Sequence, residues 1–148
     1  MQTALSEMKI TRVLNAVAAG TSVQNGSVID MLGFDGVCYV AAIGTLTATQ
    51  VTSLKAQHGD ASNLSDAADL AGTLTGPMAD ADSNKLLVLD IQKFSKRYNR
   101  VVVNRATANA VIDGVIAIQY QAHTKAPTQN STFVSASKTV IAPIAGTP

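Results

Sequence analysis

The chain has 148 residues, a length that suits one compact domain. Only 14% of the residues are charged, against about a quarter in average proteins, and 47% are hydrophobic, so a disordered chain and a charge-rich coiled coil are excluded. The net charge of +1 gives no field that would collect nucleic acid or an anionic membrane surface, and we expect neither as a partner.

The kinds of apolar and acidic residues favour strands over helices. Trp is absent, Ala, Val and Thr are abundant, and Glu7 is the only glutamate, so nearly all acidic residues are aspartates. Val and Thr are β-branched and suit a pleated surface, whereas Asp is typical of turns and caps. The composition therefore predicts an all-β fold with Asp-rich loops.

The N-terminal half begins with a polar segment, residues 1–7, which we expect to be an extended arm, and continues as short strands. Residues 8–17 predict a first strand with Met8, Ile10 and Leu14 on one face. Asn25-Gly26 is a strong hairpin signal. Residues 34–46 form a long apolar run that predicts a central, buried strand. This run contains Cys38, the sole cysteine, which we interpret as a small buried hydrophobe, the alternative being a reactive thiol.

The second half shows clearer alternation of apolar and polar residues. Residues 50–58 and 85–94 each predict a strand, and the latter places Leu87, Leu89 and Ile91 on one face. Residues 110–122 predict a last long strand, with a core face made of Ala110, Ile112, Gly114, Ile116, Ile118 and Tyr120. Seven or eight short strands with regular turn signals predict a single β-sandwich or jelly-roll-like domain over residues 8–125.

Residues 126–148 have a different character, because they contain three of the four prolines and many Ser and Thr residues. They predict either an extended C-terminal arm that lies on a neighbouring subunit or a final edge strand with a frayed end. Both interpretations stay open from the sequence.

Residue patterns for catalysis or metal binding are weak. His58 and His123 lack the spacing of metal ligands. Residues 80–84 resemble the opening of a calcium loop, but Lys85 and Ile91 occupy positions where that loop needs Gly and Glu. A looser calcium site built from Asp80, Asp82 and either Asp60 or Asp66 is an open alternative. We expect no enzyme activity, no cofactor, no catalytic residue and no metal ligand.

One cluster joins basic and aromatic side chains, Lys93, Phe94, Lys96, Arg97, Tyr98 and Arg100. This cluster could be the corner of a protein–protein interface or a solvated strand end. A nucleic-acid surface is a third interpretation, which the small net charge of the chain does not favour. Together with the two arms the cluster supplies the candidate protein-interface residues: Met8, Ile10, Arg12, Arg97, Arg100, Val140, Ile141 and Ile144.

Six stretches resemble a family of small structural proteins of tailed-phage and prophage virions: ITRVLN (10–15), VIDMLGFDG (28–36), VTSLKAQ (51–57), DLAGT (69–73), NKLLVLD (84–90) and NAVIDGVIAIQY (109–120). The resemblance spans about residues 10–120 and carries no catalytic signature. It implies a capsid decoration (cement) protein of β-sandwich or jelly-roll type, found in the virion on the capsid surface and in the host cytoplasm during assembly. The implied partners are the major capsid protein and further copies of the chain, as a dimer or trimer.

Two other functions stay open. A neck or tail component of the virion would share the same structural character. A carbohydrate-binding sandwich is the third possibility, although such modules usually present Trp or Tyr platforms, and this chain has no Trp and three Tyr. We expect residues 1–12 and 126–148 to make much of the contact with capsid or neighbouring subunits.

Overall fold

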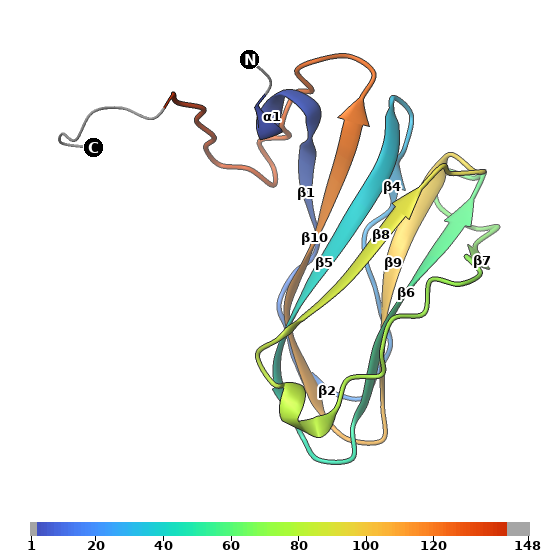
Figure 1. The fold of residues 1–148 in the computed structure, drawn as a ribbon. Coiled ribbons are helices and arrows are strands. Elements are labelled where there is room, and N and C mark those ends of the chain that lie inside the picture. The colour runs from blue at the N-terminus through green and yellow to red at the C-terminus, as the bar shows by residue number, and fades with distance from the viewer. Residues whose placement is uncertain (1–2, 142–148) are drawn as a thin grey trace, which may run out of the picture.

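The computed structural model describes residues 3–141 and consists of two antiparallel β-sheets packed against each other (Figure 1). Sheet A has the order β1–β10–β5–β8, with β2 also paired to β10, and sheet B has the order β3–β9–β6–β7, with β4 also paired to β9. The predicted all-β sandwich is confirmed.

The strands of sheet A are β1 (Lys9–Leu14), β2 (Val17–Gly20), β5 (Phe34–Leu46), β8 (Leu86–Gln92) and β10 (Ala110–Ala122). Those of sheet B are β3 (Gln24–Asn25), β4 (Ile29–Asp30), β6 (Val51–Gly59), β7 (Ala68–Asp69) and β9 (Tyr98–Ala106).

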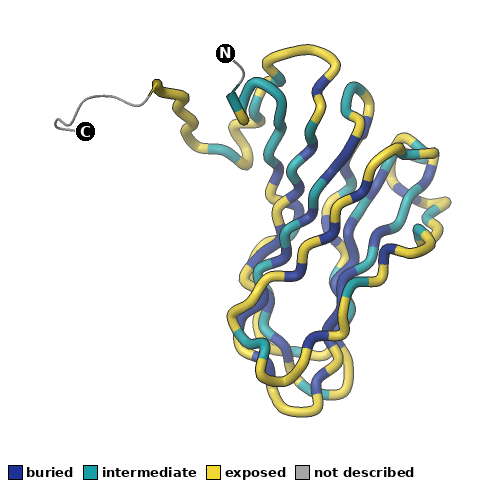
Figure 2. Tube along the Cα trace, in the orientation of Figure 1, coloured by how far each residue is buried: buried dark blue, intermediate teal, exposed yellow. Residues whose placement is uncertain are grey.

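The core lies between the two sheets, where each strand contributes every second side chain. Figure 2 shows this alternation as dark segments along the central strands. The predicted central strand is β5, whose bounds match the expected run, and its partner β8 buries the three residues expected to share one face, Leu87, Leu89 and Ile91. Because Val, Ile and Leu dominate these inner positions, removing their surface from water stabilises the sandwich.

Polar bonds also join the two sheets through the core. Tyr39 of β5 donates its hydroxyl to Asn99 Oδ1 of β9 over 2.7 Å, and both side chains are fully buried. Gln119 of β10 donates its amide to the backbone carbonyl of Asp30 over 2.8 Å. Burial raises the pKa of Tyr39, so its hydroxyl remains a donor. These bonds fix how one sheet sits on the other.

The facing of β10 differs from the prediction. The register shifts between Ile112 and Gly114, where Gly114 has a φ of +149°. Beyond this β-bulge the inward residues are Val115, Ala117 and Gln119, each at most 2% exposed. The prediction that Ile116, Ile118 and Tyr120 face the core was therefore wrong, because the extra residue of the bulge reverses the faces of the strand.

Near the N-terminus the structure shows which side of β1 is buried, and it overturns the predicted hairpin. In β1 the buried residues are Thr11 and Val13, so Ile10 lies on the outer side of sheet A. Asn25-Gly26 does not close a hairpin: Gly26 is buried and donates its N–H to the carbonyl of Val101 in β9 over 2.8 Å. Residues 24–25 and 29–30 instead pair one after the other with β9.

The segments before β1 and after β10 lie at the same end of the sandwich (Figure 1). The N-terminal arm was expected to be extended, but Ala4–Glu7 form a short helix, α1. Within the described residues 123–141 there are turns and extended segments and no strand, which favours the arm over the edge-strand interpretation. A short 3₁₀ helix, η1 (Asp80–Asp82), is the remaining helical element among residues 3–141.

Candidate interaction surfaces

The outer side of sheet A carries an apolar surface built from rows of residues on neighbouring strands. One row runs across Ile10, Ile118, Cys38 and Asp90, and the next across Arg12, Ile116, Val40 and Val88. A third row contains Ala42 and Leu86 beside Gly114. We call this surface the outer face of sheet A.

Several large apolar side chains on this face are open to solvent. Leu86 is 58% exposed, Val88 49% and Ile116 42%. A depression of about 320 Å³ lies over the second and third rows and beside Ile10, and its lining is mostly apolar. Contiguous apolar surface of this kind marks an interaction site more often than isolated exposed residues do.

Polar groups stand at the edges of the outer face of sheet A. Arg12 lies on β1 and makes one long hydrogen bond, 3.4 Å, to the backbone carbonyl of Asp113. Asp90 lies on β8 at the opposite edge and accepts a 2.6 Å hydrogen bond from the Tyr120 hydroxyl. Burial and the nearby Asp90 raise the pKa of Tyr120. The face therefore has a positive edge on β1 and a negative edge on β8.

Cys38 lies on the inner strand β5, in the first row of this face, and is half-buried, so the expectation of a buried core cysteine was wrong. Burial raises the pKa of its thiol, and the charge of Asp90 adds to the effect. The thiolate is consequently disfavoured, which argues against a reactive nucleophile.

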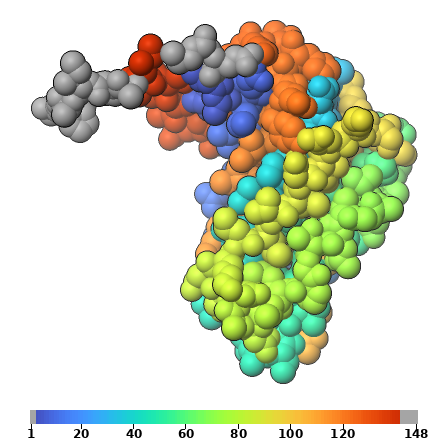
Figure 3. All heavy atoms as spheres, in the orientation of Figure 1, coloured from blue at the N-terminus to red at the C-terminus, as the bar shows by residue number. Residues whose placement is uncertain are grey.

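The second surface is the C-terminal arm, which we define as residues 126–148, of which 126–141 are described. Its base is fastened to β1: the side chain of Gln129 accepts from the N–H of Ile10 over 2.9 Å and donates to the carbonyl of Met8 over 2.7 Å. Lys125, just before the arm, pairs with Glu7 of α1. Figure 3 shows the start of the arm packed beside the N-terminal segment.

Beyond this base the arm exposes apolar side chains. Phe133 is 41% exposed, Val140 59% and Ile141 76%. Ile144, also predicted as an interface residue, lies outside the described residues. The arm is thus anchored at one end and carries uncovered apolar groups along its described length.

The predicted basic corner is occupied by internal ion pairs. Arg97 holds Asp30 with two hydrogen bonds of 2.8 and 2.7 Å, which lower the pKa of that carboxyl. Arg97 also lies over the ring of Tyr98, 5.2 Å from its centre. Arg100 donates to the side chain of Gln57 over 2.8 Å. Both arginines lie in or beside β9 of sheet B, so the structure does not join them to Met8, Ile10 and Arg12.

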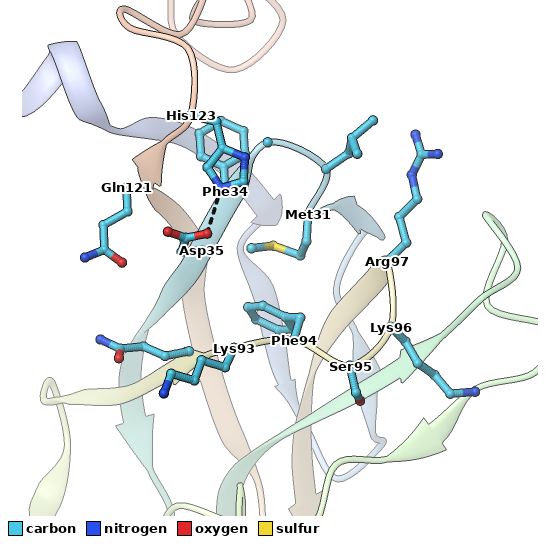
Figure 4. A pocket seen from close by; sticks show the side chains of 13 residues that line it. Met31, Phe34, Asp35, Lys93, Phe94, Ser95, Lys96, Arg97, Gln121 and His123 are labelled. Carbon is cyan, nitrogen blue, oxygen red and sulfur yellow. Dashed lines mark hydrogen bonds and ion pairs between the residues drawn. The ribbon is translucent and has the colours of Figure 1, made fainter.

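An open depression of about 770 Å³ lies beside this corner, at the end where β5 begins (Figure 4). Met31 and Phe94 point into it, whereas Lys96 and Arg97 point away. Asp35 and His123 face each other across 2.7 Å at its rim. Lys96 pairs with Asp60, Arg97 with Asp30 and His123 with Asp35, which makes this depression a weaker candidate than the two apolar surfaces.

The aspartates considered for a calcium site instead stabilise loops, through hydrogen bonds to backbone N–H groups or an ion pair. Asp66 accepts from the backbone N–H groups of Asp60 and Ala61, and Asp80 accepts from the N–H of Thr49 over 2.9 Å. Asp82 pairs with Lys85. Among residues 3–141 no three His, Cys, Asp or Glu side chains are grouped as metal ligands would be.

The sequence identified part of the outer face and missed the rest. Of this face it named Ile10 and Arg12 but not Val40, Val88, Leu86, Ile116 or Ile118. The available signal was β8, whose alternate positions are apolar on both sides of the strand up to Asp90. Such a strand needs cover on both faces.

In the part of the chain that the structure describes, no helix has the length and apolar character needed to cross a membrane. Comparison with models of known protein families and with curated protein sequences found no match for this chain.

Proposed function

We propose that this chain is a non-enzymatic structural protein of a tailed-phage or prophage virion, a capsid decoration protein that attaches to the major capsid protein through its C-terminal arm. The observation that carries the proposal is the arm itself. Its base is bonded to β1 through Gln129, while Phe133, Val140 and Ile141 are uncovered.

The rigid sandwich and the arm have complementary roles in this proposal. A two-sheet domain whose sheets are joined by hydrogen bonds through the core is rigid. The arm allows this rigid domain to contact a neighbouring surface at a greater distance. An extended segment of alternating side chains can lie along another protein and order there. On a lattice of identical subunits, each weak contact is repeated, and several contacts by one protein raise the apparent affinity.

The choice of a capsid as the partner rests on the resemblance of residues 10–120 to phage structural proteins. The small net charge is compatible with it, because contacts between protein surfaces of this kind depend on apolar burial more than on long-range attraction.

The test is binding to expanded, empty heads of the phage or prophage that encodes the chain, measured by co-sedimentation and by cryo-EM of the pellet. We expect the full chain to cover the shell in fixed stoichiometry. A variant that ends at Asn130 keeps the Gln129 bonds and should lose binding. Full binding by that variant would overturn the role of the arm, and density at a single vertex would make the protein a neck or tail component.

A matched pair of substitutions separates apolar contact from a general effect of charge on the arm. Val140→Asp with Ile141→Asp should weaken binding strongly. Ser135→Asp with Ser137→Asp adds the same charge to exposed positions of the same arm and should bind as the unchanged chain does. Equal weakening by both pairs would contradict an apolar contact at Val140 and Ile141.

A further inference from the structure

We propose that the outer face of sheet A is a self-association surface, on which a second copy of this chain packs face to face about a two-fold axis that runs along the strands. The dimer would stack four sheets, with the two A sheets in the middle. This inference does not depend on the proposed function, because it concerns the free protein and a surface other than the arm.

The first argument is the contrast between the outer sides of the two sheets. Sheet B presents polar groups to water, among them Lys55, Gln57, Arg100 and Asn104. This is the usual condition of an antiparallel sheet with one solvated face. Sheet A presents Ile10, Val40, Ala42, Leu86, Val88, Ile116 and Ile118. Only sheet A therefore has an outer face that gains by being covered.

The second argument is the placement of charge. In the four-strand path β1–β10–β5–β8, Arg12 lies on one edge and Asp90 on the other, in adjacent rows. A two-fold axis along the strands places β1 of each copy over β8 of the other. Arg12 then lies within the reach of its long side chain from Asp90 of the second copy, twice per dimer, across sheets that pack about 10 Å apart.

The same charges disfavour the other two-fold arrangement. An axis in the plane of the face but perpendicular to the strands would lay β1 over β1 and β8 over β8. Arg12 would then lie over β1 and Asp90 over β8 of the second copy, where this face carries no group of opposite charge. An axis through the row of Arg12 would also bring the two Arg12 side chains together, which is destabilising at an interface. The charge pattern thus favours a second copy of the chain as the partner on this face, and it also favours the two-fold axis that runs along the strands.

The size of the face predicts a weak dimer. Four strands spaced about 4.8 Å apart and three rows about 6.7 Å apart give a face of about 400 Å² per copy. Two such faces bury about 800 Å² together, below the roughly 1,200 Å² at which stable interfaces begin. We therefore expect a monomer–dimer equilibrium that becomes visible between about 10 µM and 1 mM.

The first test is sedimentation equilibrium of the full chain over this range of concentration, with Val88→Lys as the variant. A lysine at Val88 would be buried without a partner in the dimer, so we expect association to weaken about tenfold or more. Val51→Lys is the matched control, since Val51 is 42% exposed against 49% for Val88 and lies on sheet B. It should dimerise as the unchanged chain does, and thermal melting should confirm that both variants fold.

The second test addresses the orientation. Arg12→Glu and Asp90→Lys should each weaken association, and the chain carrying both should recover it, because the pair is restored in the opposite sense. Cys38, the sole cysteine, lies on the inner strand β5 beside the proposed axis, and an axis along the strands keeps the two copies of Cys38 in the same row. A short bifunctional maleimide should therefore link two copies in the unchanged chain and not in Val88→Lys.

Two results would overturn the inference. One is a chain that stays monomeric up to about 1 mM, the upper end of the range expected for a face of this size. The other is a dimer that Val88→Lys leaves intact, which would place the contact elsewhere. Recovery of dimerisation only in the doubly changed chain would support the two-fold axis along the strands, and no recovery would reject that axis.

Discussion

A single arginine organises one end of the sandwich. Arg105 of β9 is 3% exposed, and burial lowers its pKa. Its guanidinium donates to the backbone carbonyls of Ala18, Ser22 and Ala110 at 2.9, 2.9 and 2.7 Å. These acceptors belong to β2, to the turn after it and to β10, so one side chain from sheet B holds the edge of sheet A.

Replacing Arg105 with glutamine leaves several of these buried carbonyls without a donor. We expect Arg105→Gln to lower the free energy of unfolding by about 2–4 kcal/mol, measured by urea denaturation. Arg100→Gln is the control on the same strand, because Arg100 is half-buried on the outer side and makes one bond to Gln57. That change should cost less than about 1 kcal/mol. Equal costs would show that the carbonyl bonds of Arg105 contribute little.

At the scale of one element, the bulge in β10 decides which residues cover the core and which form the outer face of sheet A. Gly114 adopts a φ of +149°, a conformation that side chains with a Cβ rarely adopt. A Cβ at this position would also lie 3.2 Å from Arg12 Nη2 and 3.4 Å from the carbonyl oxygen of Leu14. The bulge therefore depends on glycine.

Gly114→Ala should accordingly destabilise the protein by about 1–3 kcal/mol in thermal or urea unfolding. Gly20→Ala is a suitable comparison, since Gly20 lies on β2 of the same sheet, its φ is ordinary, and its new Cβ would make an ordinary van der Waals contact, 3.4 Å from Arg105 Nη2. It should be neutral or slightly stabilising. If Gly114→Ala leaves the free energy of unfolding unchanged, the bulge can accommodate a side chain at this position and does not depend on glycine.

Across the whole molecule, aspartates in strands and loops share one dependence on pH. Four have a pKa below the usual value of 3.8, through hydrogen bonds from a side chain or from the backbone: Asp30 with Arg97, Asp66 with Asp60, Asp69 with Lys55 and Asp82 with Lys85. A carboxyl whose pKa is lower in the folded state than in the unfolded state stabilises the fold above the unfolded pKa. That contribution disappears as the pH falls through the folded pKa.

We therefore expect the melting temperature to be steady near neutral pH and to fall as the pH drops below about 4. Asp30→Asn separates one of these groups from the rest. It should melt below the unchanged chain at pH 7, and the gap should close in acid, where Asp30 of the unchanged chain is protonated. If the difference in melting temperature persists in acid, Asp30 stabilises the fold through the shape of its side chain and not through its charge.

The sequence predicted the fold class and the two strands with the plainest patterns, β5 and β8. In β5 the apolar run is long and bounded by turn residues, and in β8 the inward Leu87, Leu89 and Ile91 form a regular period of two. The sequence also predicted the bounds of β10, residues 110–122, but not which of its faces is buried beyond Gly114, because both faces carry apolar residues. Only Gly114 inside that pattern indicated a bulge.

Of the two candidate surfaces, the sequence predicted the arm but not most of the outer face of sheet A. Residues of the arm were identified because its composition departs from that of the domain. The outer face of sheet A was missed, since alternation was interpreted as a core face and a solvated face. Ile116 and Val88 are apolar residues on the solvent side of sheet A, so both sides of their strands are apolar. In such strands the sequence pattern alone does not say which side faces the other sheet.

The position of α1 and the arm at one end of the sandwich has a practical consequence. The turns that join β5 to β6 and β9 to β10 lie at the opposite end (Figure 1). A peptide inserted next to Ala108, in the second of these turns, would point away from any surface that holds the arm. If the arm binds a shell, this small sandwich is a ready carrier for displaying foreign peptides outward, with both chain ends left unmodified.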